Sequence, residues 1–162
     1  MRFGDGYAMV APAPGADAPD YARKARGASG LHILLAEDNP INMILIRELL
    51  RRHGHRITEV TTGNAAVQAL LENCYDLLLT DIHMPGMDGI EAARAIRADE
   101  ARSGRARTPI VAFTADALEG GKRVCQEAGM DGILTKPVDP AALEEMFLLL
   151  FPSEEPSHIV AA

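Results

Sequence analysis

Five short, mostly aliphatic runs recur along the middle of the chain, each separated from the next by an amphipathic stretch. Strands that are covered on both faces of a parallel sheet read as continuous apolar runs, and their alternation with helices is typical of βαβ units. The pattern predicts a doubly wound α/β fold with five parallel strands and five helices. The expected strands are His32–Ala36, Arg56–Val60, Tyr75–Thr80, Pro109–Phe113 and Gly132–Thr135.

These repeats are expected to form one domain over residues 31–151. Residues 1–30 are rich in Ala, Pro and Gly and show neither the helical nor the strand periodicity of apolar residues, so they are predicted to be a linker or flexible segment. Residues 152–162 are short and polar and are predicted to be a flexible tail. Right-handed crossovers and a strand order of 2-1-3-4-5 would leave a ligand crevice at the carboxyl ends of strands one and three.

Composition excludes several function classes. A formal net charge of −7, with the basic residues scattered among acids, argues against nucleic-acid binding. Cys74 and Cys125 stand apart in the sequence, without His or Cys at metal-ligand spacing, so neither a disulfide nor a zinc site is expected. The protein is therefore expected in the reducing cytoplasm. The chain has neither an apolar run long enough to insert into a membrane nor a signal peptide.

Polar side chains stand at the carboxyl ends of four predicted strands. Glu37 and Asp38 follow the first, Asp81 the third, Thr114 the fourth and Lys136 the fifth. In a doubly wound sheet these ends form one edge, so the sequence predicts that the five side chains converge on the crevice.

Three converging carboxylates need a counter-charge beyond one lysine, because each close pair costs about 4 kcal/mol at an effective dielectric near 20. Mg²⁺ is the expected cation, since it prefers oxygen ligands and keeps waters that Glu37 and Asp38 can hold. With the metal and Lys136 drawing charge from a phosphoryl group, Asp81 becomes a nucleophile toward phosphorus. The Thr114 hydroxyl can donate to a phosphoryl oxygen and so report the modification.

These residues lie in four ordered motifs: AEDNP at 36–40, TDIHMPGMDG at 80–89, FTA at 113–115 and LTKP at 134–137. Together they resemble response-regulator receiver domains of two-component signalling, which have a flavodoxin-like fold. The resemblance covers residues 31–151, and the residues within these motifs are most similar to those of receivers of hybrid sensor histidine kinases.

The resemblance implies that Asp81 accepts a phosphoryl group from a histidine kinase or a histidine phosphotransfer protein. It implies that Asp38, Asp81 and the main-chain oxygen of His83 ligate Mg²⁺, with Glu37 acting through water. It also implies a cis Lys136–Pro137 bond. One position departs from the family: receivers often have Tyr or Phe three residues before the lysine as part of the switch, and this chain has Ile133.

Two further sets of residues are expected near the crevice. His83 and Asp116 each follow a site residue by two positions and are expected to flank the route of water to the acyl phosphate, where they would tune its lifetime. On the first helix, Leu45, Ile46, Leu49 and Leu50 are expected to face the core, which leaves Ile41 and Ile44 as a docking site for a partner's helices.

The predicted function is therefore a regulatory phosphoacceptor module of a phosphorelay, which catalyses only its own modification. Two alternatives stay open. One is a degenerate receiver that binds partners without phosphorylation; the other is an aspartate-nucleophile phosphohydrolase, although that chemistry usually places a second Asp where this chain has His83. The apolar run 146–151 predicts self-association or contact with a neighbouring kinase domain.

Overall fold

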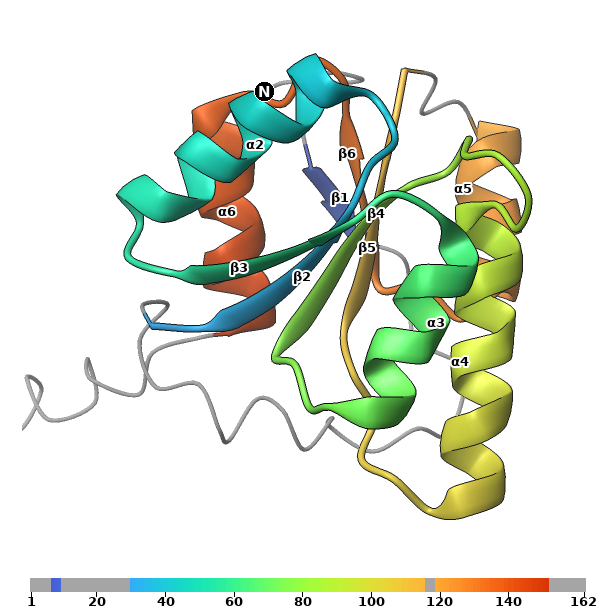
Figure 1. Ribbon diagram of the computed structural model, residues 1–162. Helices are drawn as coiled ribbons and strands as arrows, with labels where there is room; N and C mark the ends of the chain where they lie inside the picture. The colour runs from blue at the N-terminus through green and yellow to red at the C-terminus, as the bar shows by residue number, and fades with distance from the viewer. Residues whose placement is uncertain (1–6, 10–29, 116–118, 152–162) are drawn as a thin grey trace, which may run out of the picture.

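The structure, a computed structural model, describes residues 7–9, 30–115 and 119–151. Strands and helices alternate along the main body of the chain, as the sequence predicts (Figure 1). The strands are β1 (Tyr7–Met9), β2 (His32–Ala36), β3 (Arg56–Val60), β4 (Leu77–Asp81), β5 (Ile110–Thr114) and β6 (Gly132–Thr135). The helices are α2 (Pro40–Arg52), α3 (Gly63–Glu72), α4 (Gly89–Ser103), α5 (Glu119–Glu127) and α6 (Pro140–Leu150).

The sheet has the order β1-β6-β5-β4-β2-β3. Strands β2 to β6 are parallel. When these five strands are numbered one to five along the chain, their order in the sheet is 2-1-3-4-5, so the predicted doubly wound topology with five helices is confirmed. Strands β4 and β5 begin one or two residues later than expected, which places Asp81 and Thr114 as the last residues of their strands.

Strand β1 was not predicted. It pairs antiparallel with the outer edge of β6, with Ala8 opposite Ile133. It lies within residues 1–30, for which the sequence predicts a linker. Residues 10–29 and the predicted tail 152–162 lie outside the described residues, so the proposed domain boundaries stay predictions.

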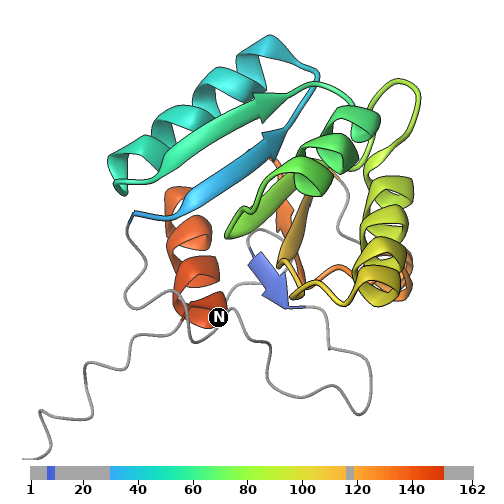
Figure 2. The ribbon, with the colours of Figure 1, turned by 60° about the horizontal axis from the view of Figure 1, so that its bottom comes forward.

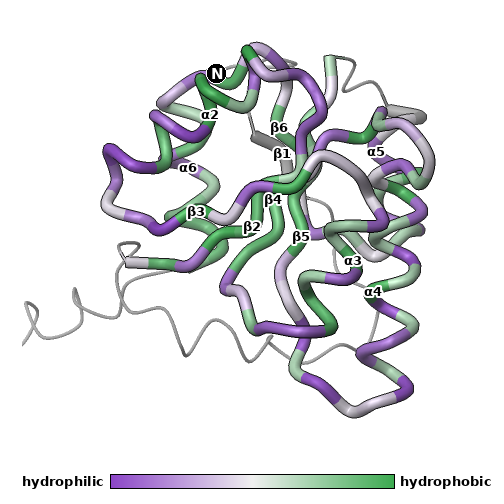
Figure 3. Tube along the Cα trace, viewed as in Figure 1, coloured by the Kyte–Doolittle hydropathy of each residue, from purple (hydrophilic) through white to green (hydrophobic). Residues whose placement is uncertain are grey.

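Helices cover both faces of the sheet. Figures 1 and 2 show α2 and α6 on one face and α3, α4 and α5 on the other. Alternate strand residues supply two separate cores, because successive side chains of a strand point to opposite faces. Leu35, Leu79 and Phe113 belong to the core beneath α2 and α6, whereas Leu34, Leu78 and Ala112 belong to the other. The apolar strands accordingly lie at the centre of the molecule in Figure 3.

Helix α2 begins as predicted, with the Asn39 side chain accepting from the N–H groups of Ile41 and Asn42 and with Pro40 at the first position. The expected core face is wrong at one position: Leu45 is 56% exposed. Met43 faces the core instead. The buried residues of this helix are Met43, Ile46 and Leu50, which lie on one face at helical spacing, and Leu45 is outside that face.

Helix α6 leaves part of its apolar run exposed. Phe147 and Leu150 are buried against the sheet, while Leu148 is 62% and Leu149 48% exposed. Two adjacent leucines cannot both face the core when their neighbours on either side already do. The sequence-based expectation of self-association or a neighbouring domain here stays a prediction.

An ion network fixes the amino-terminal ends of β5 and β6. The buried Asp131 carboxylate accepts from the Ile110 N–H at 2.9 Å, from Arg97 Nη2 at 3.0 Å and from Arg107 Nη2 at 2.9 Å. Arg97 also donates to the Gly129 carbonyl, so that α4, β5 and the loop before β6 are tied together. Because the amino-terminal ends are held, the opposite ends of these strands arrive in register at the far edge of the sheet.

The helices are short. The longest, α4, has 15 residues and carries Arg, Asp and Glu along its length. In the part of the chain that the structure describes, no helix combines the length and the apolar character that a membrane crossing requires.

A buried histidine links the end of α2 to α6. His55 is 5% exposed, its Nδ1 accepts from the Leu31 N–H at 3.1 Å, and its ring centroid lies 4.6 Å from that of Phe147. Burial, followed by the charge of His53, lowers the pKa of His55 from 6.5 to about 4. The folded state therefore holds a neutral imidazole that the unfolded chain would protonate below pH 6.5.

We expect acid to destabilise the fold through His55. Because the folded pKa is depressed, the unfolded state binds the extra proton, and stability is lost as the pH falls from 6.5 toward about 4. Between pH 7 and 5 the loss should be about 2 kcal/mol. Urea unfolding of wild type and His55→Gln, which keeps an acceptor for Leu31, measures it; His83→Gln, at an exposed histidine, is the control. An equally steep pH dependence in His55→Gln would contradict the assignment.

Candidate functional site

Strands β2, β4, β5 and β6 end at one edge of the sheet. Ala36 lies opposite Thr80, Asp81 opposite Phe113, and Thr114 opposite Thr135. The ladder continues one step further, since the Lys136 N–H donates to the Thr114 carbonyl at 2.8 Å. The residues that the sequence places at strand ends are therefore carried to a common edge by the register of the parallel sheet.

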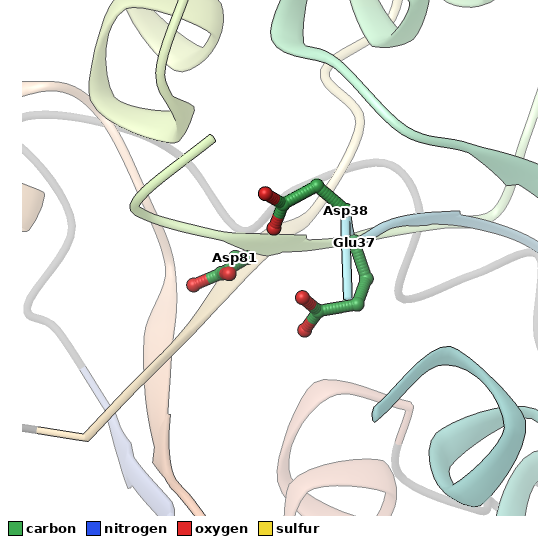
Figure 4. Close-up of side chains that lie close together, drawn as sticks. All are labelled: Glu37, Asp38 and Asp81. Atoms are coloured by element: carbon green, nitrogen blue, oxygen red, sulfur yellow. The ribbon is translucent and has the colours of Figure 1, made fainter. Parts of the chain in front are cut away.

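Three carboxylates meet at this edge. Figure 4 shows Glu37 and Asp38, which follow β2, beside Asp81 at the end of β4. Each offers an oxygen, and these oxygens all lie within 4.8 Å of one another. Glu37 is 1% and Asp81 5% exposed, while Asp38 is exposed. Two negative charges are thus buried beside a third that faces solvent.

Lys136 lies against two of these carboxylates. Its Nζ is 3.2 Å from Asp81 Oδ2 and 3.4 Å from Glu37 Oε1. The contact with Glu37 is ionic only, because Oε1 has no hydrogen-bond partner among the described residues. One ammonium thus balances part of the charge of three carboxylates, and a buried carboxylate oxygen keeps an unused lone pair.

The surplus negative charge is reflected in Glu37. Burial raises the pKa of Glu37, and the neighbouring Asp81 raises it further, against the lowering effects of the Asn39 N–H and of Lys136. Glu37 Oε2 accepts the Asn39 N–H at 3.1 Å, which fixes the carboxylate at the start of α2.

The donor set of this cluster fits a hard divalent cation. All of its ligand atoms are carboxylate oxygens, without sulfur or imidazole nitrogen, and Mg²⁺ and Ca²⁺ are the cations that such oxygens bind. The buried Glu37 oxygen and the exposed Asp38 allow a cation to be held with part of its hydration shell, which is how Mg²⁺ is usually bound.

Thr114 and His83 lie at the same edge. Thr114 is buried at the end of β5, beside the strand that carries Asp81. His83 is exposed, and its backbone N–H donates to Asp81 Oδ1 at 3.4 Å. Asp116 lies outside the described residues, so its predicted place beside the site stays a prediction.

Gly89, which the sequence analysis did not identify, packs closely against the backbone of Asp81 and Ile82. As the first residue of α4 it donates its N–H to the Ile82 carbonyl at 2.8 Å. A Cβ there would collide with the Asp81 carbonyl and lie 3.1 Å from the Ile82 Cα. The available signal was a glycine directly after Asp88, which caps α4 in a reciprocal pair with Glu91.

The remaining predicted residues frame the site. Ile41 and Ile44 are 68% and 49% exposed at the start of α2, directly after the acidic pair, and Leu45 joins them. Ile133, at the position where an aromatic residue is usual, is 1% exposed within the core beneath α3, α4 and α5. The Lys136–Pro137 peptide bond is cis, as the resemblance implies.

The sequence matches the family model of the response regulator receiver domain over residues 33–148. The chain is 43% identical over 116 residues to the sensor protein GacS of Pseudomonas syringae pv. syringae, an alignment that covers 72% of this chain and 13% of that protein. It is 36% identical over 140 residues to the sensor histidine kinase GacS of Pseudomonas protegens, covering 86% of this chain and 15% of the relative. The chain thus spans about a seventh of the length of these curated relatives.

Solved structures agree. The receiver domain of the sensor histidine kinase PA1611 from Pseudomonas aeruginosa, crystallised with a magnesium ion in its active-site cleft, is 41% identical with a TM-score of 0.67, over 75% of this chain and 98% of that one. The receiver domain of Ssk1 from Saccharomyces cerevisiae, crystallised with the histidine phosphotransfer protein Ypd1, is 32% identical with a TM-score of 0.70, over 74% of this chain and 88% of that one.

The fold, the acidic cluster at the carboxyl edge of the sheet and the match over residues 33–148 agree with one another. The chain belongs to the response regulator receiver domain family, and its homologues are the receivers of hybrid sensor histidine kinases.

Proposed function

We propose that Asp81 is the phosphoacceptor of a phosphorelay and takes its phosphoryl group from a phosphohistidine. The observation that supports this most directly is the position of its carboxylate, which has an oxygen within 4.8 Å of oxygens of the acidic pair and another 3.2 Å from Lys136 Nζ. An incoming phosphoryl group would therefore meet a nucleophile flanked by a cation site and an ammonium.

Asp38, Asp81 and the main-chain oxygen of His83 would hold Mg²⁺, and Glu37 would act on it through water. When bound, the ion neutralises charge on the phosphoryl oxygens and allows a carboxylate to approach them. Support comes from the oxygen-only donor set and from the magnesium ion in the cleft of the PA1611 receiver.

In the transfer, a carboxylate oxygen of Asp81 forms a bond to phosphorus as the bond from phosphorus to the donor histidine nitrogen breaks. The imidazole leaves with the electron pair and is neutral because its other ring nitrogen carries a proton, so no oxidant or further reactant is needed. Lys136 Nζ would pair with a phosphoryl oxygen, a role that its contact with Asp81 Oδ2 at 3.2 Å supports. The Thr114 hydroxyl would donate to another and so carry the change into β5.

The donor would be a histidine kinase or a histidine phosphotransfer protein. The Ssk1 receiver, 32% identical to this chain, binds such a protein, Ypd1. We place the reaction in the cytoplasm, in keeping with Cys74 and Cys125 both being free thiols. Contact with a neighbouring kinase domain is also proposed, because the sensor-protein relative is much longer than this chain.

Incubation with Mg²⁺ and acetyl phosphate should add one phosphoryl group to the protein. Intact-mass spectrometry should show the gain in wild type and its absence in Asp81→Asn or in the presence of EDTA, because the amide is a poor nucleophile and the chelator removes the counter-charge. The adduct should be labile to base, as an acyl phosphate is.

The same experiment separates the alternatives. An unmodified wild-type protein that still binds a phosphotransfer protein would identify a degenerate receiver, and steady turnover of phosphate monoesters would identify a phosphohydrolase. A mass gain that persists in Asp81→Asn would place the phosphoacceptor elsewhere.

We propose that the side chains of His83 and Asp116 tune the lifetime of the acyl phosphate. His83 is exposed and its backbone N–H contacts Asp81 Oδ1, so the residue stands next to the nucleophile and is open to solvent. We expect His83→Ala and Asp116→Ala to change the dephosphorylation rate several-fold, less than the roughly hundredfold or more of a positioned general acid or base, because each side chain would only flank the attacking water. The loss of phosphoprotein mass with time measures this, and unchanged rates in both variants would contradict the role.

The start of α2 is proposed as the docking site of the phosphodonor. Ile41, Ile44 and Leu45 form an exposed apolar stripe with i, i+3, i+4 spacing that begins three residues after Asp38. A helical donor seated there would bring its histidine to the mouth of the site. Exposed leucines also occur at the far end of α6, which supplies a matched comparison.

Ile41→Glu should slow phosphoryl transfer from a histidine phosphotransfer protein by tenfold or more, about 1.4 kcal/mol, since a central apolar contact is replaced by a charge. Transfer from acetyl phosphate should not change, because the site itself is intact. Leu149→Glu, an equally drastic change on α6, should leave both rates as in wild type. Equal slowing by the two variants would argue against docking at α2.

A further inference from the structure

The loop between β4 and α4, residues 82–88, is fastened at both ends. At its start the Ile82 N–H donates to the Phe113 carbonyl at 3.3 Å, and the Ile82 carbonyl accepts the Gly89 N–H at 2.8 Å. At its end, Asp88 and Glu91 cap each other's backbone N–H groups at 2.8 and 3.0 Å. We call these residues the β4–α4 loop. It carries His83, which follows the nucleophile by two positions.

A third fastening comes from a different element, the first turn of α3. The Gly63 N–H donates to the Met87 carbonyl at 3.1 Å, although Met87 stands 24 positions further along the chain. A helix leaves its first N–H groups without partners inside the helix, and here the loop supplies one. Thr62 caps the same turn by accepting the Ala65 N–H at 3.1 Å, so the Gly63 N–H is held in place.

The approach is so close that only glycine fits. A Cβ on Gly63 would collide with the Met87 carbonyl oxygen, and it would also lie 2.9 Å from the Met87 carbonyl carbon and 3.0 Å from the Asp88 oxygen. All three atoms are backbone, so no side-chain rotation relieves the contact. Gly63 does not adopt a left-handed backbone conformation, so the requirement for glycine here comes from the lack of space and not from its φ angle.

We propose that Gly63 is a positioning residue for the Mg²⁺ and phosphorylation site. It sets the height of the β4–α4 loop above the sheet, and through the loop it sets where the main chain of His83 lies relative to the Asp81 carboxylate. Gly63 belongs to α3 and is not itself part of the acidic cluster. The inference rests on the proposed function, because it assumes that the His83 main-chain oxygen is a ligand.

Gly63→Ala distinguishes this role from ordinary helix chemistry. Alanine is the better helix former, so at an uncrowded helical position the change would be neutral or stabilising. If the loop is set by Gly63, the added methyl group instead displaces Met87 and the chain that leads back to His83. We expect Mg²⁺ affinity to fall about tenfold, the lower end of what loss of supporting contacts around a metal costs.

Mg²⁺ titrations by calorimetry and by amide NMR of wild type, Gly63→Ala and Gln68→Ala test the proposal. Gln68 is exposed on the same helix and serves as the control, which should bind Mg²⁺ like wild type. Phosphorylation by acetyl phosphate should be slowed in Gly63→Ala at limiting Mg²⁺ and recover at saturating Mg²⁺, a pattern that a purely structural defect would not give. Unchanged Mg²⁺ affinity in a folded Gly63→Ala would overturn the inference while leaving the proposed function intact.

Wild-type protein keeps the proposal testable if Gly63→Ala does not fold. The Gly63 amide resonance should shift with Mg²⁺ along the same saturation curve as the amide of His83, since Met87 links the two. A Gly63 resonance that stays fixed while that of His83 moves would overturn the inference. Wild type that binds no Mg²⁺ at all would instead remove the proposed function, and this inference with it.

Discussion

The structure depends on the repulsion among Glu37, Asp38 and Asp81, which one ammonium does not cancel. Like charges about 4 Å apart repel by about 4 kcal/mol at an effective dielectric near 20, and burial of two of the three weakens their solvation. Lys136 contacts two of the carboxylates, and among the described residues Glu37 Oε1 still has no hydrogen-bond partner. A protein holds such a cluster only when the rest of the fold fixes the strands that carry it.

The fold supplies that rigidity at the edge opposite the site. Strands β2, β4 and β5 are covered on both faces by close-packed aliphatic side chains, and the Asp131 network ties β5 and β6 to α4 where these strands begin. Because a parallel ladder transmits register along its whole length, fixed amino-terminal ends mean fixed carboxyl ends. The repelling carboxylates are thereby prevented from moving apart, and the cluster keeps its preference for a cation.

Much of this could be predicted from the sequence, for a physical reason. Strand ends in a parallel sheet share one edge, so Glu37, Asp81 and Lys136 could be brought together from period and order alone. Other features depend on contacts that no local pattern encodes. Strand β1 forms by backbone pairing at an exposed edge, Leu45 is exposed because the axis of α2 presents Met43 instead, and the fit of Gly63 against Met87 joins residues far apart in sequence. Periodicity describes which face is apolar, and tertiary contacts decide the rest.

The same packing bears on how the proposed modification of Asp81 would reach the surface. In many receivers an aromatic side chain three residues before the lysine moves inward with the threonine; here Ile133 already lies in the core and has no ring to rotate. Thr114 and Lys136, which the proposed function assigns to the phosphoryl group, are joined through the ladder between β5 and β6. Under the proposed function, a displacement at the site would travel as a shift of these strand ends. The edge of β6, along which β1 pairs, is the first surface that such a shift would reach.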